Sequence, residues 1–200
     1  MRLKTNKNGY KNTKRRYFSY WTILHLFRWE SYERNTVLAD QEEKNWKKDL
    51  DNVKAKTSGW DGLRYEIIKN ISSFASEKVL PEISKNLNTH YCNWSCKEAW
   101  INYYQQDDKS LPHAHFFIDY CAILIVKAGD GNLNFIEPKY TLGATREWED
   151  HQIHKINERN GMFIFFPAWM HHYVEACKEE RITVAFNFMN LKINDWKICY

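Results

Sequence analysis

The chain has 200 residues, of which 44% are hydrophobic and 16% aromatic, with a formal net charge of +4. This composition suffices for one sizeable core and excludes disorder of the whole chain. The charge is uneven, because residues 1–16 contain seven Lys or Arg and no acidic residue, which leaves −3 (+4 minus +7) for the rest. We expect a basic flexible tail at 1–16 and a single domain at 17–200. A solvated terminus explains the tail, and nothing beyond it indicates nucleic acid.

An apolar run from Tyr17 to Trp29 follows the tail. It is too short to span a bilayer and contains His25 and Arg28, so we interpret it as an early strand or short helix of the core. A secretory signal remains the alternative, although no small-residue cleavage site follows. The five cysteines are odd in number and show no C-x-x-C pair, which favours reduced thiols and a cytoplasmic location without membrane contact.

Helical support is predicted at 38–80. Asp40 with Glu43 resembles a capping box, and apolar residues then recur at helical spacing, which predicts a helix over about 41–56. A second amphipathic helix begins near Leu63 and should stop before Pro81.

A β core is predicted over about 91–190. On the first strand, Trp100, Asn102 and Tyr104 should share one face, because side chains alternate along a strand. An apolar strand at 121–127, a turn at Asp130 and Gly131, and a strand through Leu133 and Phe135 follow. The polar segment 139–160 is predicted to be a loop or short helix that forms a lid.

The stretch 161–188 predicts a strand at 162–166, a turn at Pro167, a return strand around Tyr173 and a last strand over 181–188. In the last strand Arg181, Thr183, Ala185 and Asn187 share one face, and apolar residues share the other. A cation, a hydroxyl and an amide in a row suit a small anionic ligand.

A second polar cluster has the sequence P-H-A-H-F-F-I-D-Y and contains His113, His115 and Asp119. Two histidines at i and i+2 lie on one face of a strand, near enough for both imidazoles to converge on one ion. Together with the distant His172, the pair favours a metal site. Asp119 can join it only if residues 116–118 form a tight turn.

The order of these motifs resembles the double-stranded β-helix (jelly-roll, cupin-like) core of the iron(II)- and 2-oxoglutarate-dependent oxygenases, most closely the short oxygenase-like proteins frequent in phage genomes. The likeness runs from residue 100 to residue 188 and rests on W-x-N-x-Y, P-H-x-H, G-x-x-x-x-F-P-x-W-x-x-H-x-V and R-x-T with F-N. It implies a mainly β fold with N-terminal helices.

The resemblance implies that His113 and His172 bind iron(II), and that Arg181 with Thr183 binds the distal carboxylate of 2-oxoglutarate, assisted by Asn102 or Tyr104. The sequence departs from the family at the third ligand, because His115 occupies the place of the usual aspartate. Two arrangements follow: His115 completes a three-histidine set with Asp119 orienting an imidazole, or Asp119 is itself a ligand. We favour the first, because it needs no assumption about a turn.

The implied function is a dioxygenase that uses iron(II), 2-oxoglutarate and O2, hydroxylates a C–H bond and releases succinate and CO2. A cupin-type metalloenzyme without 2-oxoglutarate and a non-catalytic binding or structural β-helix module are the alternatives. We assign His171 to packing or to the substrate rim, and His151 and His154 to a solvated lid. Neither the prime substrate nor the oligomeric state follows from the sequence.

Overall fold

The computed structural model describes residues 16–19, 22–28, 46–50, 52–89, 93–136 and 153–191, with the backbone alone for 16–19, 22–28 and 47–50. These ranges form one sheet of twelve strands. The strands are β1 Arg16–Ser19, β2 Thr22–Arg28, β3 Lys47–Leu50, β4 Val53–Thr57, β5 Trp94–Tyr104, β6 Lys109–His113, β7 Tyr120–Lys127, β8 Leu133–Ile136, β9 Ile153–Lys155, β10 Met162–Pro167, β11 His172–Val174 and β12 Arg181–Asn190.

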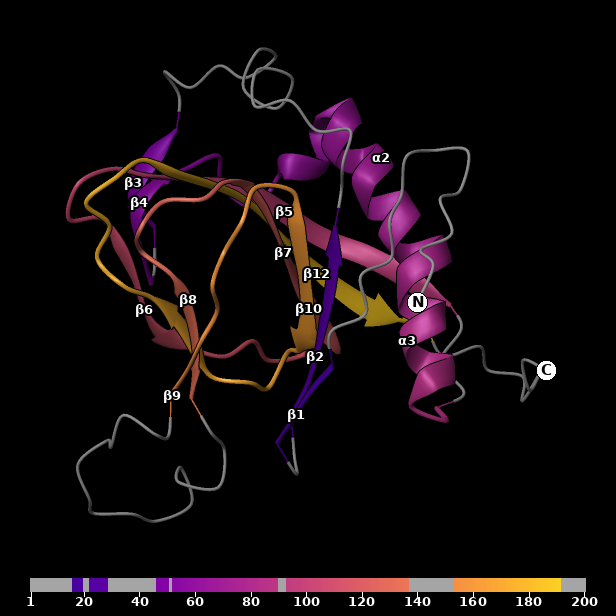
Figure 1. Ribbon diagram of the computed structural model, residues 1–200. Helices are drawn as coiled ribbons and strands as arrows, with labels where there is room; N and C mark the ends of the chain where they lie inside the picture. Colours follow the sequence, from indigo (N-terminus) through magenta and orange to yellow (C-terminus); the bar gives the residue numbers. More distant parts are fainter. Residues whose placement is uncertain are drawn as a thin grey trace.

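The sheet curls into two facing layers. Its strand order is β1-β2-β10-β7-β12-β5-β4-β6-β11-β8-β9, with β3 paired to β4, and neighbours are antiparallel. In Figure 1 the layer from β2 to β5 stands beside the helices, and β4, β6 and β8 form the opposite wall. This is the predicted mainly β, double-stranded β-helix architecture, and the inside of the curl is where a ligand can be held.

Two apolar clusters hold the layers together. One fills the space between the helices and the outer face of the long layer, and it includes Ile182, Val184, Phe186 and Phe188 from alternate positions of β12. The other lies inside the curl, around Phe135, Phe166 and Ile125. Burial of each such side chain contributes about 1.5–3 kcal/mol. The predicted alternation of β12 is thus confirmed, because its odd-numbered residues face inward and its even-numbered residues face the helices.

The helical support continues through Pro81 rather than stopping before it. It comprises a 3-10 turn at Gly62–Arg64, α2 Glu66–Phe74, a π-helical turn at Ala75–Val79 and α3 Leu80–Asn86. The predicted end was wrong because Pro81 lies in the first turn of α3, where its missing N–H is not needed. Ile68, Ile71 and Leu80 are fully buried against the sheet.

The helix predicted over 41–56 is also wrong within the described residues, where β3 and β4 form a hairpin. Val53, Ala55 and Thr57 alternate as buried residues along β4. The strand pairs with β5 on one part and β6 on another, so tertiary pairing overrides the local helical spacing. Residues 41–45, which include Glu43 of the supposed capping box, lie outside the described residues, as does Asp40.

Both ends of the curl include segments whose structure the sequence left open. The run 17–29 contributes β1 and β2, and β2 pairs with β10, so the strand interpretation is correct. The predicted lid is described only from 153 onward, where β9 pairs with β8 and Ile156 is buried. Residues 1–15 of the tail lie outside the described ranges. Within those ranges no helix has the length and apolar character to cross a membrane.

Candidate metal centre and active site

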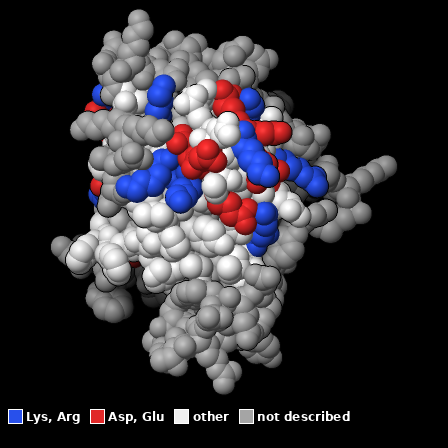
Figure 2. Space-filling view, turned by 90° about the vertical axis from the view of Figure 1, so that its left-hand side faces the viewer, with Lys and Arg blue, Asp and Glu red and all other residues white. Residues whose placement is uncertain are grey.

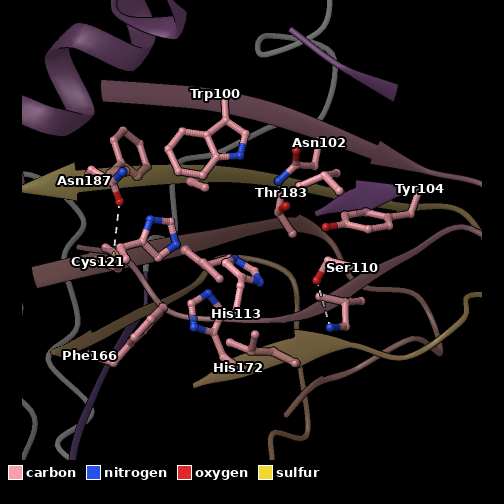
Figure 3. Close-up of a pocket in the computed structure, with 18 of the residues that line it drawn as sticks. Trp100, Asn102, Tyr104, Ser110, His113, Cys121, Phe166, His172, Thr183 and Asn187 are labelled. Atoms are coloured by element: carbon pink, nitrogen blue, oxygen red, sulfur yellow. Dashed lines mark hydrogen bonds between the residues drawn. The ribbon is translucent and has the colours of Figure 1, made fainter. Parts of the chain in front are cut away.

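A pocket lies inside the curl, between the face of β5 and β12 and the opposite wall (Figure 3). Both polar motifs of the sequence meet in it. Its polar lining residues are Trp100, Asn102, Tyr104, Ser110, His113, His115, His172, Arg181, Thr183 and Asn187.

Three histidines from two chain segments converge at one end of this pocket. His113 is the last residue of β6 and His172 the first of β11, and the two are paired across these strands. One ligand nitrogen from each of His113, His115 and His172 lies within 4.8 Å of the others. Their ring centroids are 4.2 Å (His113–His172), 5.2 Å (His113–His115) and 5.4 Å (His115–His172) apart. Such a cluster could hold one metal ion.

The backbone orients two of these imidazoles. His113 Nδ1 lies 2.7 Å from the carbonyl oxygen of Leu111, and His172 Nδ1 lies 2.9 Å from that of Met170. A carbonyl oxygen only accepts hydrogen bonds, so both Nδ1 atoms must donate and therefore carry the ring proton. This leaves Nε2 of each ring as the nitrogen able to bind a metal.

Burial favours the uncharged form of two of these imidazoles. Burial, followed by the charge of His113, lowers the pKa of His115 from 6.5 to about 4. The pKa of His172 is also well below its ordinary value, chiefly because the ring is buried and secondarily because of His113, against an opposing hydrogen bond to Met170. Neutral imidazoles are the form that binds metals. The three-histidine cluster therefore presents lone pairs without a negative charge.

Asp119 lies elsewhere. Its exposed carboxylate accepts a hydrogen bond from the backbone N–H of Asn190 at 2.7 Å, at the end of β12. It is not part of the cluster of three, and backbone carbonyls rather than Asp119 orient His113 and His172. His171 and His154 are exposed, and His151 lies outside the described residues.

The predicted anion-binding residues share the pocket face of two paired strands. Arg181 is opposite Tyr104, and Thr183 is opposite Asn102. All four side chains are at least nine-tenths buried. The Arg181 guanidinium lies over the Tyr104 ring, 5.0 Å from its centroid. Burial raises the pKa of Tyr104 to about 12, so its hydroxyl stays protonated and able to donate.

Arg181 already has a partner that the sequence did not indicate. Its Nε donates to Oε2 of Glu158 at 2.8 Å and its Nη2 to Oε1 at 2.6 Å, and the two side chains are 1% and 0% exposed. Oε1 of Glu158 also accepts the backbone N–H of Leu133. Burial alone lowers the pKa of Arg181, but the charge and hydrogen bonds of Glu158 raise it overall. Glu158 belongs to the segment expected to be a lid.

Two buried polar atoms of the pocket have no partner of their own. These are Nε1 of Trp100 and Oδ1 of Asn102, on residues that are each 5% exposed. An indole N–H only donates, so it requires an acceptor such as a carboxylate oxygen, and a rotated Asn102 amide would offer its NH2 to the same anion. Trp100 also stacks on His115, at 6.1 Å between ring centroids. The lining residues therefore fit a metal ion and an adjacent keto acid.

Three exposed aromatic side chains lie on the two loops that adjoin the histidine cluster in the chain. Phe116 and Phe117 are 79% and 93% exposed, and Trp169 is 50% exposed. Their two loops are joined, because the N–H of His115 donates to the carbonyl of Ala168 and the N–H of Ala168 donates to that of Asp119. Trp60 packs edge-on against Trp100.

Charges on the surface are mixed in sign. In Figure 2, basic and acidic side chains of the described residues alternate over the upper part of the face, and the part below them is largely uncharged. A continuous basic stripe, which typifies nucleic-acid binding surfaces, is absent from the described part of this face.

Comparison with known proteins yields one family. The sequence profile of the family described as "Putative 2OG-Fe(II) oxygenase" matches residues 98–187. That range contains all three histidines of the cluster, Glu158 and the Arg181–Thr183 pair. No functionally curated protein matches the chain.

Solved structures with this fold include two prolyl hydroxylases and HygX. A Pseudomonas putida prolyl-4-hydroxylase is 13% identical with a TM-score of 0.56, covering 78% of this chain and 83% of its own. The viral collagen prolyl hydroxylase of Paramecium Bursaria Chlorella virus-1, in complex with 2OG, is 12% identical with a TM-score of 0.54, over 82% of this chain and 94% of its own. HygX from Streptomyces hygroscopicus, with nickel and 2-oxoglutarate bound, is 8% identical with a TM-score of 0.57, over 87% and 85%.

At these identities the solved structures establish the shared fold, and the sequence profile adds a family resemblance over residues 98–187. Together they confirm the resemblance that the motif order indicated, including its mainly β, double-stranded β-helix fold. By the match over residues 98–187 and by its fold, this chain is therefore similar to the 2OG-Fe(II) oxygenases, enzymes that use iron(II), 2-oxoglutarate and dioxygen.

Proposed function

We propose that this protein is a non-haem iron(II)- and 2-oxoglutarate-dependent dioxygenase that hydroxylates a C–H bond and forms succinate and CO2. One observation carries the proposal: three imidazoles converge in the same buried pocket as Arg181, Thr183 and the unpartnered polar atoms of Trp100 and Asn102. A metal site alone would not require the second group of residues.

The residues divide into two sets along the pocket. His113, His115 and His172 would hold iron(II), which when bound supplies the redox chemistry and a chelation point for the keto acid. Arg181 and Thr183 would receive the distal carboxylate of 2-oxoglutarate, and Tyr104 would add a hydroxyl donor. Trp100 Nε1, beside His115, would donate to a carboxylate oxygen nearer the metal.

The order of burial suggests the route of the prime substrate. Arg181 lies deep in the pocket, whereas His113 and His115 lie nearer the surface, beside the exposed Phe116, Phe117 and Trp169. We place the substrate entrance at this aromatic mouth. The keto acid would then occupy the inner end, and the C–H bond to be hydroxylated would meet the metal from outside.

A three-stage titration tests the function. Iron(II) is added anaerobically to the purified protein, 2-oxoglutarate is then titrated while the absorption band of the chelated keto acid is followed, and oxygen is finally admitted. We expect iron to bind at one equivalent, the band to saturate, and succinate to accumulate slowly even without the prime substrate.

Two variants keep this experiment specific for the keto acid. Thr183→Val and Trp100→Phe each remove one polar atom from the pocket; the first preserves side-chain volume, and the second keeps an aromatic ring. Each should weaken 2-oxoglutarate binding by about 5- to 100-fold while iron binding is retained, because each leaves a carboxylate oxygen unpaired. Arg181→Ala is a poorer choice, because it would leave the Glu158 carboxylate buried without its cation.

The same titration separates the two alternatives. Iron binding without any response to 2-oxoglutarate would identify a cupin-type metalloenzyme, and absence of iron binding would identify a non-catalytic module. No observation favours either alternative at present, and Arg181 with Thr183 at the inner end of the pocket argues against the first.

A further inference from the structure

The Glu158–Arg181 ion pair contacts the pocket in which the metal and the keto acid are proposed to bind. Arg181 lines that pocket, and Glu158 neutralises it through two hydrogen bonds in a fully buried environment. An arginine that served only to bind a ligand carboxylate would need no carboxylate partner within the protein. The carboxylate partner therefore needs an explanation within the site.

The charge of the metal end supplies one. In the common set of two histidines and one carboxylate, the protein contributes one negative charge to the iron. Here His115 takes the place of the carboxylate ligand, and the three-histidine cluster contributes no negative charge. The two positive charges of iron(II) and the two carboxylates of 2-oxoglutarate cancel, so a lone Arg181 would leave the loaded site with one uncompensated positive charge. Buried charges without compensation are strongly unfavourable.

We propose that Glu158 is the charge-balancing carboxylate of this site, supplying at its Arg181 end the negative charge that the three-histidine metal end lacks. Glu158 then acts on the ligands through the electrostatic potential of the pocket and through Arg181, without touching the metal. It is a positioning and specificity-determining residue that rests on the proposed oxygenase function.

The placement of the pair is compatible with such an action at a distance. Arg181 is opposite Tyr104, and Trp100, which stacks on His115, is four residues away on the same strand. Four residues of a strand span roughly 13 Å. At that separation, and with an effective dielectric constant between those of a protein site and water, one charge changes the affinity for a divalent cation by roughly 3- to 70-fold.

Glu158→Gln is the informative variant. The glutamine can still accept hydrogen bonds from the N–H of Leu133 and from Arg181, but it removes the negative charge. We expect the affinity for Zn2+, used as a redox-inert probe, to fall by about 3- to 70-fold. The affinity of the metal-loaded protein for 2-oxoglutarate should rise, by about 5-fold or more, because Arg181 is no longer neutralised.

The opposite signs of these two changes distinguish charge balance from other roles. If Glu158 only positioned Arg181, 2-oxoglutarate affinity would fall and Zn2+ affinity would stay constant. If Glu158 merely competed with the keto acid for Arg181, 2-oxoglutarate affinity would rise and Zn2+ affinity would again stay constant. Either result would overturn the proposal.

Two further proteins complete the test. Glu175→Gln removes a charge of the same sign from an exposed pair with Lys155, and it should change neither affinity. The double variant Arg181→Gln/Glu158→Gln removes both charges of the buried pair, so its Zn2+ affinity should equal that of the wild type although 2-oxoglutarate binding is lost. A lowered Zn2+ affinity in the double variant would contradict the proposal even if Glu158→Gln alone fails to fold, because charge balance predicts that the loss of both charges leaves the metal end unaffected.

The wild-type titration keeps this inference separate from the function on which it rests. A wild-type protein that binds neither metal nor 2-oxoglutarate would refute the oxygenase function itself. A wild-type protein that binds both, with Glu158→Gln lowering both affinities or neither, would refute the charge-balancing role alone.

Discussion

The histidine cluster is where single residues can be tested most directly. His172 is 3% exposed and is paired across strands with His113, so no neighbouring group can take its place as a metal ligand. We predict that His172→Ala lowers iron(II) affinity by at least about 100-fold, the scale seen when a metal loses a direct ligand or its support. Anaerobic iron titration measures this. The control is His154→Ala on β9, an exposed histidine outside the cluster, and equal losses in the two variants would contradict the assignment.

The third ligand has its own comparison. His115→Ala should weaken iron binding strongly, whereas Asp119→Ala should leave it within about 2-fold, because the Asp119 carboxylate accepts the N–H of Asn190 rather than facing the cluster. Loss of that exposed hydrogen bond should lower the free energy of unfolding by about 1 kcal/mol. Iron titration and denaturant unfolding of both variants provide the two readouts. The reverse order of iron affinities would transfer the third ligand to Asp119.

The sequence indicated most of these residues but missed Glu158. Strand geometry places residues i and i+2 on one face. The pairing of His113 with His115, and of Arg181 with Thr183, could therefore be predicted from the sequence. A buried arginine also demands a counter-charge. Which acidic residue supplies it depends on the path of the chain between β9 and β10, and no local pattern marks Glu158 among the other acidic residues of that polar segment.

Strands and helices were predictable where their pattern agreed with their surroundings. β5 and β12 alternate clearly because one face meets the helices and the other the pocket. β4 could not be predicted, because its residues also fit helical spacing and only pairing with β5 and β6 decides its structure. The same limitation applies to Pro81, whose position within the first turn of α3 depends on the π-helical turn before it.

The backbone at the start of the helical segment lies in close contact with β5. We therefore predict that the glycine at this contact cannot be replaced by a residue with a side chain without loss of stability. A Cβ on Gly62 would lie 2.4 Å from the carbonyl oxygen of Ala99, which is backbone and cannot move aside. We predict that Gly62→Ala lowers the free energy of unfolding by more than about 2 kcal/mol. Gly59→Ala is the matched control, because Gly59 has a positive φ of 75° but nothing within 4 Å, so only strain of about 1–2 kcal/mol is expected. Denaturant unfolding should rank the variants in this order.

For the molecule as a whole, the neutral histidines make stability depend on pH. The pKa of His115 is about 4 in the folded protein and 6.5 when unperturbed, and that of His172 is lowered in the same direction. Between these values the unfolded chain binds protons that the folded chain does not. The free energy of unfolding of the metal-free protein should therefore be highest above about pH 6.5 and fall as the pH drops toward about 4.

Denaturant unfolding at several pH values between 7.5 and 4.5 measures this dependence. Carboxylates contribute at the acidic end, so the informative quantity is the difference between the wild type and His115→Gln, which has no imidazole at that position. The variant should show a shallower decline over this range. Identical slopes would mean that His115 is protonated as readily in the folded chain as in the unfolded one.

The backbone tie between the two loops at the pocket mouth has a consequence for how the metal is acquired. The N–H of His115 and the N–H of Ala168 link the loop after β6 to the loop after β10, and both bonds are formed between backbone groups alone. The cluster is thus preorganised, so a metal should add stability by mass action alone and should not be needed for folding. Prolonged chelation should leave the circular dichroism spectrum unchanged, and re-addition of iron(II) should restore the site rapidly. A protein that unfolds under chelators would instead belong with those whose metal holds the chain together.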